Sequence, residues 1–226
     1  MTAPRKVVPW SSMSELARQP DSVLLSAWRD GDMSAGRALV DRHLPALHRF
    51  FGSKLGNDAD AEDLVGDTLE TLLGAVERFR EASSFRTFLY GIAHNVLRNF
   101  VRKRARRGED KDWGHVSAVE LGPGPSTLLS GKLRERGLVR ALRTLPLELQ
   151  TIVELSYVEE LSRSEIAEVT GLAAGTVASR LRRARKLLKE ALEPQLATNE
   201  LLRKSAAGLD SWARELRLEN EEGQAS

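Results

Sequence analysis

Apolar residues recur at helical spacing through two long blocks of the chain. Neither block holds a useful length of the strict alternation that marks a half-buried strand. A segment with four acids and the helix-breaking sequence Gly-Pro-Gly-Pro separates the blocks. The pattern predicts an all-α protein with two helical domains, at 21–107 and 134–193, joined by a flexible linker at 108–133. Residues 1–20 are rich in Pro, Ser and Thr and predict a mobile tail, and residues 194–226 form a C-terminal extension.

Composition excludes several classes of protein. Hydrophobic residues make up 41% of the 226 residues, which is sufficient for packed cores. The chain has no cysteine, so disulfides, thiolate metal sites and cysteine nucleophiles are excluded. No apolar run has the length of a membrane span or resembles the core of a signal peptide, so we expect a cytoplasmic protein without a membrane partner. The net charge is only +2 although 29% of residues are charged, so charge acts through its placement.

The second block contains the pattern of a helix-turn-helix. Ser162 and Glu165 have the spacing of a capping box, and Gly171 can end the helix that they begin. A second helix is predicted from about Gly175 to the stop at Pro194, with an inward apolar stripe of Val177, Leu181, Ala184 and Leu188. Its opposite side is polar and basic, as a helix that reads the major groove requires, and the candidate DNA-binding residues there are Thr176, Ser179, Arg180, Arg183 and Lys186. A basic helix alone is more often a solvated face, but its combination with the capping box and the glycine turn favours DNA binding.

A second cationic helix is predicted from Ser84. No acid occurs between Glu81 and Glu109, whereas seven lysines and arginines do. The helix is apolar on one side, and the residues expected on its outer face are Thr87, Tyr90, His94, Arg98 and Arg102. Its basic end can neutralise phosphates, and the loop at 79–84 can form a pocket for an extruded base. For a single aromatic such as Tyr90, core packing is the alternative to DNA contact.

Acidic residues gather at the start of the helix predicted after Asn57: Asp58, Asp60, Glu62, Asp63 and Asp67. Carboxylates at this end of a helix are favoured by the helix dipole. A metal site is the other interpretation, but these acids have neither a histidine partner nor a glycine-punctuated loop. We therefore expect no metal and no cofactor.

Two separate motif sets, in order along the chain, resemble one family. The sequence LPLELQTIVELSYVEELSRSEIAEVTGLAAGTVASRLRRARKLL is similar to the promoter-recognition domain of bacterial sigma factors of the extracytoplasmic-function (ECF) group, in the sigma-70 family. The sequences DAEDLVGDTLETLL and ERFREASSFRTFLYGIAHNVLRNFVRKR resemble the other conserved domain of that group. The resemblance covers about residues 21–107 and 134–192.

The resemblance implies a subunit that directs core RNA polymerase to promoters and melts them, with no catalysis of its own. The first domain would bind the beta-prime clamp and the minus-ten element, and the second would bind the beta flap and the minus-thirty-five element. The implied minus-ten residues are Arg80, Ser83, Ser84, His94, Asn95, Arg98, Arg102 and Lys103. The implied polymerase-binding residues are Asp60, Asp63, Leu64, Val65 and Asp67.

Three positions depart from the pattern that the resemblance implies. Gly66 replaces a glutamine that is usual in the family, and a mid-helix glycine costs about 1 kcal/mol. His94 stands at a position that is often basic, and Ala178 at one that is often lysine. The promoter sequence therefore cannot be copied from relatives.

Two other classes of function remain as alternatives. A helix-turn-helix regulator would bind duplex DNA without being a polymerase subunit. An enzyme would need a nucleophile and a base in a formed site, but the four histidines are scattered and there is no glycine-rich phosphate loop.

The further partner expected is an anti-sigma factor or the C-terminal extension acting in cis. In that extension an apolar face at Leu201, Leu209 and Trp212 either docks on another surface or belongs to a loosely ordered tail.

Overall fold

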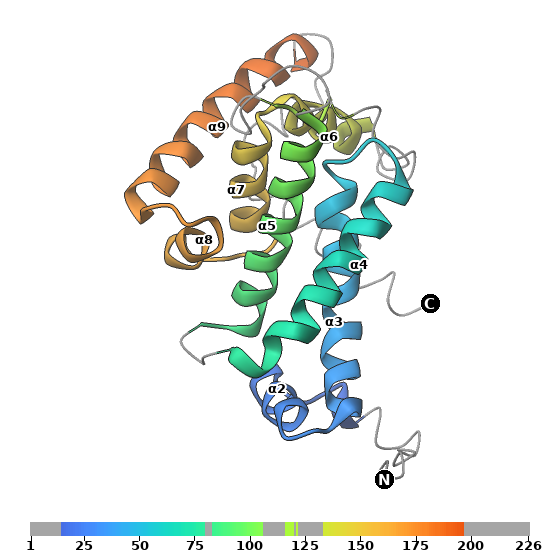
Figure 1. Ribbon diagram of the computed structural model, residues 1–226. Helices are drawn as coiled ribbons and strands as arrows, with labels where there is room; N and C mark the ends of the chain where they lie inside the picture. The colour runs from blue at the N-terminus through green and yellow to red at the C-terminus, as the bar shows by residue number, and fades with distance from the viewer. Residues whose placement is uncertain (1–14, 80–82, 106–115, 120, 122–132, 197–226) are drawn as a thin grey trace.

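The computed structural model describes residues 15–79, 83–105, 116–119, 121 and 133–196. Throughout these ranges the elements are helices, which confirms the all-α prediction (Figure 1). The N-terminal domain comprises α2 (Asp21–Arg29), α3 (Met33–Gly52), α4 (Asp58–Ala75), the 3₁₀ turn η1 (Val76–Arg78) and α5 (Phe85–Ala105). The C-terminal domain comprises α6 (Leu133–Thr144), α7 (Leu147–Tyr157), α8 (Arg163–Thr170) and α9 (Ala174–Leu196). The C-terminal extension beyond Leu196 lies outside the described residues.

Side-chain caps begin the long helices of the N-terminal domain. The Asp32 carboxylate accepts hydrogen bonds from the backbone amides of Ser34 (2.9 Å) and Ala35 (3.2 Å), at the start of α3. The Asn57 side chain accepts one from the Asp60 amide (2.7 Å), at the start of α4. These contacts satisfy amides that have no partner within the helix. The apolar faces of the helices then bury a shared core that includes Leu24, Leu39, Leu47, Phe51, Leu72, Leu89 and Leu97.

The start of α2 is tied to α3, and the linker differs from prediction. Asp21 is the first residue of α2, and its carboxylate pairs with Arg42 and with His43 Nε2 (2.7 Å) of α3. Burial raises the pKa of Asp21, but these two partners lower it more, so the pKa lies below its usual value. Within the predicted linker, Val116, Ala118 and Leu121 are buried, and the Leu147 amide donates to the Val116 carbonyl (2.8 Å). This part of the linker is anchored to the corner between α6 and α7, because its three apolar side chains gain burial there.

The helix-turn-helix forms as predicted, with one difference at its end. Ser162 and Glu165 make both hydrogen bonds of the capping box, and Gly171 has a φ of 71°. The inward stripe of α9 is confirmed, because Val177, Leu181, Ala184 and Leu188 are all buried. The predicted stop at Pro194 is wrong, since α9 continues to Leu196. Proline so near the end of a helix disturbs only the last turn, where few backbone hydrogen bonds remain to be broken.

The two domains lie against each other. Helix α5, green in Figure 1, runs between α4 of its own domain and α8 of the C-terminal domain, and it packs against both. One face of α5 is therefore covered by the other domain rather than by solvent.

Replacing Gly36 by alanine will lower the free energy of unfolding by about 1–3 kcal/mol. A Cβ atom at this position of α3 would lie 2.7 Å from the indole ring of Trp28, which is buried beneath it. Urea unfolding followed by circular dichroism measures the loss. The matched change is Gly66→Ala in α4, where a Cβ would meet nothing within 4 Å, and it should stabilise the chain by about 0.5–1 kcal/mol. Equal effects of the two substitutions would contradict this packing.

Candidate nucleic-acid interface

Helix α9 presents its predicted DNA-reading side to solvent. Ser179, Arg183 and Lys186 are exposed, and Thr176 is half-buried beside them. The half-buried Arg180 forms an ion pair with Glu148 of α7. Sequence reasoning missed Glu148, because it lies 32 residues away and carries no local signal. Since Arg180 already has a carboxylate partner, a hydrogen bond from this side chain to a base must replace or share that ion pair.

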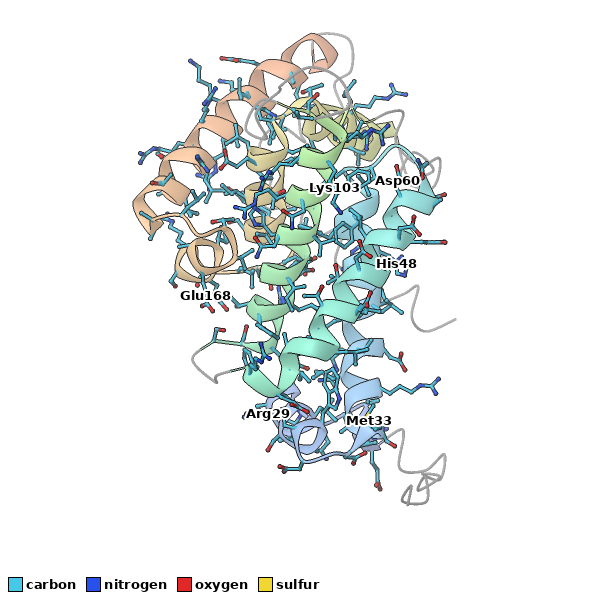
Figure 2. The ribbon with its side chains drawn as sticks, viewed as in Figure 1. Arg29, Met33, His48, Asp60, Lys103 and Glu168 are labelled. Atoms are coloured by element: carbon cyan, nitrogen blue, oxygen red, sulfur yellow. The ribbon has the colours of Figure 1, made fainter. Side chains whose placement is uncertain are left out.

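The C-terminal end of α5 forms a second cationic surface. Asn95, Arg98, Arg102 and Lys103 are all exposed, and of these Arg98 and Arg102 were predicted on the outer face of the helix. Beside them Arg104 pairs with the half-buried Asp60 of α4 at 3.3 Å. Figure 2 shows Asp60 and Lys103 at the same end of the N-terminal domain. Clustered cations of this kind suit a phosphate backbone.

An open groove lies at the opposite end of α5. It has a volume of about 770 Å³ and is lined by α2 together with Phe79, Ser83, Ser84 and Phe85. Ser83 is half-buried and Ser84 is exposed, with the Ser84 hydroxyl 2.8 Å from that of Thr87. Arg80 lies outside the described residues. The described part of the predicted base-binding loop thus borders a groove with room for a nucleobase.

The predicted outer face of α5 is wrong at Thr87, Tyr90 and His94, which are 1%, 1% and 4% exposed. The apolar periodicity correctly gave the side that faces the N-terminal core, but α8 covers this second side. Burial lowers the pKa of His94 to about 4, and the positive charges of Arg98 and Lys54 act in the same direction. His94 is therefore neutral at neutral pH and is not a surface cation in this arrangement.

Helix α4 carries an acidic exposed face. Asp63 and Asp67 are exposed, as predicted for polymerase-binding residues. Leu64 and Val65 were predicted to share this surface, but both are 4% exposed and belong to the core. Sequence reasoning missed Leu73, which is 57% exposed. Leu73 lies three residues after Glu70 on the exposed side of α4, so helical spacing could have predicted that this leucine is exposed.

Neither a metal cluster nor a membrane span occurs in the described residues. Among them, no group of three or more histidines and acids could hold a metal ion. No helix in the described ranges is long and apolar enough to cross a membrane.

Comparisons with known proteins match both domains of the chain. The family model described as Sigma-70 region 2 matches residues 39–107, and that of Sigma-70, region 4 matches 135–188. The chain is 29% identical over 183 residues to the ECF RNA polymerase sigma-E factor of Haemophilus influenzae, covering 77% of this chain and 96% of that protein. The Escherichia coli (strain K12) factor of the same name is 28% identical over 182 residues, with 77% and 95% covered.

Two solved structures are also similar. The sigma factor RpoE of Bartonella quintana, in complex with the anti-sigma factor NepR, has a TM-score of 0.56 and 30% identity, covering 68% of this chain and 94% of that chain. CnrH, in complex with the cytosolic domain of CnrY, has a TM-score of 0.57 and 26% identity, covering 77% and 97%.

Proposed function

Because the chain belongs to the ECF group of the sigma-70 family, we infer that it directs core RNA polymerase to promoters and initiates transcription there. The observation that carries this function is the pair of cationic surfaces on separate domains, one on α9 and one on α5. A regulator that binds only duplex DNA uses the first surface and leaves the second without a role. Core polymerase is present in the cytoplasm, which supports action in that compartment.

The exposed side of α9 is the proposed reader of the minus-thirty-five element. Arg183 and Lys186 can bind bases or phosphates from the major groove, and Ser179 is a small polar group near the start of the helix. The minus-ten region is proposed to be held by the exposed basic side chains of α5, which are Arg98, Arg102 and Lys103. The groove beside Ser83 and Ser84 is proposed to take an extruded minus-ten base.

The exposed acids of α4 are the proposed contact with the polymerase clamp. Asp63 and Asp67 point away from the core, and Leu73 adds an exposed apolar side chain further along the helix. The beta flap is the proposed partner of the C-terminal domain. One of the two similar structures is a sigma factor in complex with an anti-sigma factor, which supports an anti-sigma partner for this chain as well.

An electrophoretic shift assay with and without core polymerase tests this function. A duplex promoter fragment should be retarded specifically only when core polymerase is present, because polymerase fixes the spacing of the two DNA-binding surfaces. A helix-turn-helix regulator would instead retard the duplex alone. Tight, sequence-specific binding by the isolated chain at physiological salt would favour that regulator.

Replacing Arg180 or Arg183 by alanine will weaken recognition of the upstream element by about 1–3 kcal/mol for each bidentate arginine–base pair that the substitution removes. Competition binding of the polymerase complex to promoters with intact and scrambled upstream elements measures this change. Lys189→Ala is the matched control, because it removes one exposed cation from α9 outside the candidate set. Binding to a pre-melted template should change little. An equal effect on duplex and pre-melted templates would show that α9 does not read the upstream element.

A further inference from the structure

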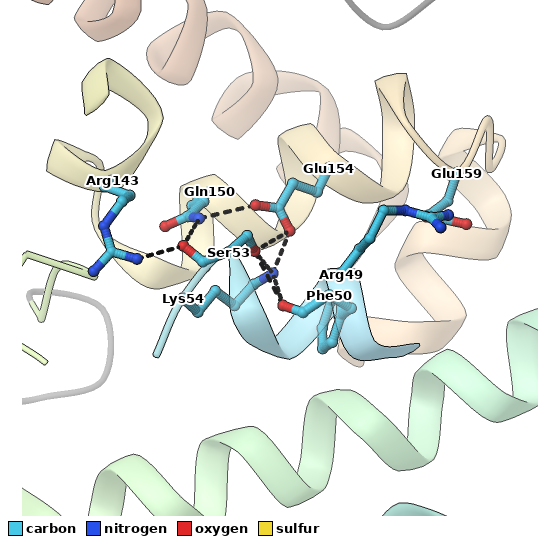
Figure 3. A network of polar contacts seen from close by, with 8 residues as sticks. All are labelled: Arg49, Phe50, Ser53, Lys54, Arg143, Gln150, Glu154 and Glu159. Atoms are coloured by element: carbon cyan, nitrogen blue, oxygen red, sulfur yellow. Dashed lines mark hydrogen bonds and ion pairs between the residues drawn. The ribbon is translucent and has the colours of Figure 1, made fainter. Parts of the chain in front are cut away.

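A buried ion pair joins the two domains (Figure 3). Lys54, just after α3, is 0% exposed, and its ammonium group donates to the Glu154 carboxylate of α7 and to the Phe50 carbonyl (2.7 Å). The Ser53 hydroxyl donates to the same carboxylate at 3.1 Å. Burying two charges is costly unless each finds its partner, so this ion pair favours the arrangement of the domains that brings Lys54 and Glu154 together.

The backbone beside Lys54 is held by the C-terminal domain as well. The Ser53 carbonyl accepts hydrogen bonds from Arg143 Nη1 (2.8 Å) and from Gln150 Nε2 (3.2 Å), as Figure 3 shows. Gln150 Nε2 also donates to Glu154 (2.8 Å). One end of α3 therefore fits into a set of polar groups supplied by α6 and α7.

Acidic side chains of the C-terminal domain also face basic side chains of α3 and α5. Glu159, which is 8% exposed, has one carboxylate oxygen 3.7 Å from Arg49 and the other 3.8 Å from Arg86. Glu165 accepts a hydrogen bond from the Thr87 hydroxyl at 3.2 Å. Glu159 thus gives an arginine of α3 and an arginine of α5 a carboxylate partner from the C-terminal domain.

Thr87, Tyr90 and His94 form a buried stripe on α5 next to the exposed Asn95 and Arg98, and Glu165 of the docked C-terminal domain contacts Thr87 in it. We propose that the chain has a closed, autoinhibited state in which Glu154 and Glu159 hold the two domains together and cover this face of α5 against single-stranded DNA. The DNA-binding role of that face rests on the proposed function, whereas the closed state rests on the observed interdomain ion pairs and hydrogen bonds alone. Burial lowers the pKa of Lys54 although Glu154 acts in the opposite direction. Opening returns Lys54 to water, and the recovered hydration offsets part of the ion pair that is lost.

Distance measurement between two spin labels tests the closed state directly. The chain has no cysteine, so His48→Cys and Lys189→Cys, both at exposed positions on different domains, give two unique labelling sites. We expect one narrow distance distribution in the otherwise unaltered chain. Adding Glu154→Gln and Glu159→Gln should shift it to longer and broader distances. Adding Glu168→Gln and Glu190→Gln, which removes the same charge from exposed positions, should leave it unchanged.

A broad distribution in the unaltered chain, or a narrow one that survives replacement of Glu154 and Glu159, would overturn the proposal. If the double variant loses its helical circular dichroism, Glu159→Gln alone carries the test, because it leaves the Lys54–Glu154 pair intact. The same two double variants, unlabelled, are then titrated with a fluorescent oligothymidine strand. The variant without Glu154 and Glu159 should bind on the order of tenfold more tightly than its charge-matched control, as release of a mostly closed state requires. Domain opening without tighter binding would overturn the autoinhibitory role. It would not contradict the proposed sigma-factor function, because promoter-directed transcription is measured separately.

Discussion

Acidification from about pH 7 to about pH 5 will lower the free energy of unfolding by about 2 kcal/mol through His94 alone. In the folded chain the pKa of His94 is about 4, because the ring is buried and lies near the positive charges of Arg98 and Lys54. In the unfolded chain the pKa returns to about 6.5. Between these values the unfolded chain binds more protons than the folded chain. Stability is therefore lost as the pH falls through the unfolded pKa, and the loss ends near the folded pKa.

Urea unfolding at several pH values measures this dependence, and His94→Gln should abolish most of it. His48→Gln is the matched control, since His48 is exposed and should leave the dependence intact. Asp21 does not confuse the test, because its folded pKa lies below 3.8 and its contribution is lost only at more acidic pH. The same pH dependence in the chain with His94→Gln would show that His94 is not the group responsible.

Reversing two charges on α4, with Asp63→Lys and Asp67→Lys, will weaken binding to core polymerase by at least about 2 kcal/mol, or about thirtyfold. Both carboxylates are exposed, so the fold should persist. Leu73→Ala should weaken binding in the same direction by removing an exposed apolar anchor. Fluorescence anisotropy of a labelled chain titrated with core polymerase measures these affinities.

The control for net charge is the pair Glu168→Lys and Glu190→Lys on exposed positions of the C-terminal domain. Circular dichroism must show native helicity in every variant. Leu64→Ala is unsuitable as a binding test, because Leu64 is a core residue and its truncation should cost about 2–5 kcal/mol of stability. Unchanged affinity after reversal of Asp63 and Asp67 would remove α4 from the polymerase interface.

Local sequence patterns were sufficient to predict those parts of the structure that depend on residues close together in the sequence. The capping box at Ser162 and Glu165 and the left-handed Gly171 follow from spacing and glycine chemistry, and both are observed. The inward stripe of α9 follows from helical periodicity in the same way. The exposed cations of α9 and α5 could be predicted for the same reason, because the side opposite an apolar stripe faces away from its own domain core.

Apart from the helix stop at Pro194, the main failures concern packing between distant segments. Periodicity shows that α5 has a second face, but the burial of Tyr90 and His94 on that face depends on packing against α3 and α8, which local spacing does not show. Burial of Lys54 depends on Glu154, one hundred residues further on. No local rule distinguishes such a lysine from an exposed one, because the partner that makes its burial tolerable is supplied by the other domain.

Run-off transcription by core polymerase on genomic fragments, with start sites mapped at nucleotide resolution, is the most direct test of sigma-factor function. We expect discrete transcripts that appear only when this chain is added, and that decrease when Asp63 and Asp67 are reversed or Arg183 is replaced by alanine. The opposite result would be a chain that binds duplex DNA specifically by itself and gives no new start site with core polymerase. That outcome would contradict a sigma factor and favour a helix-turn-helix regulator.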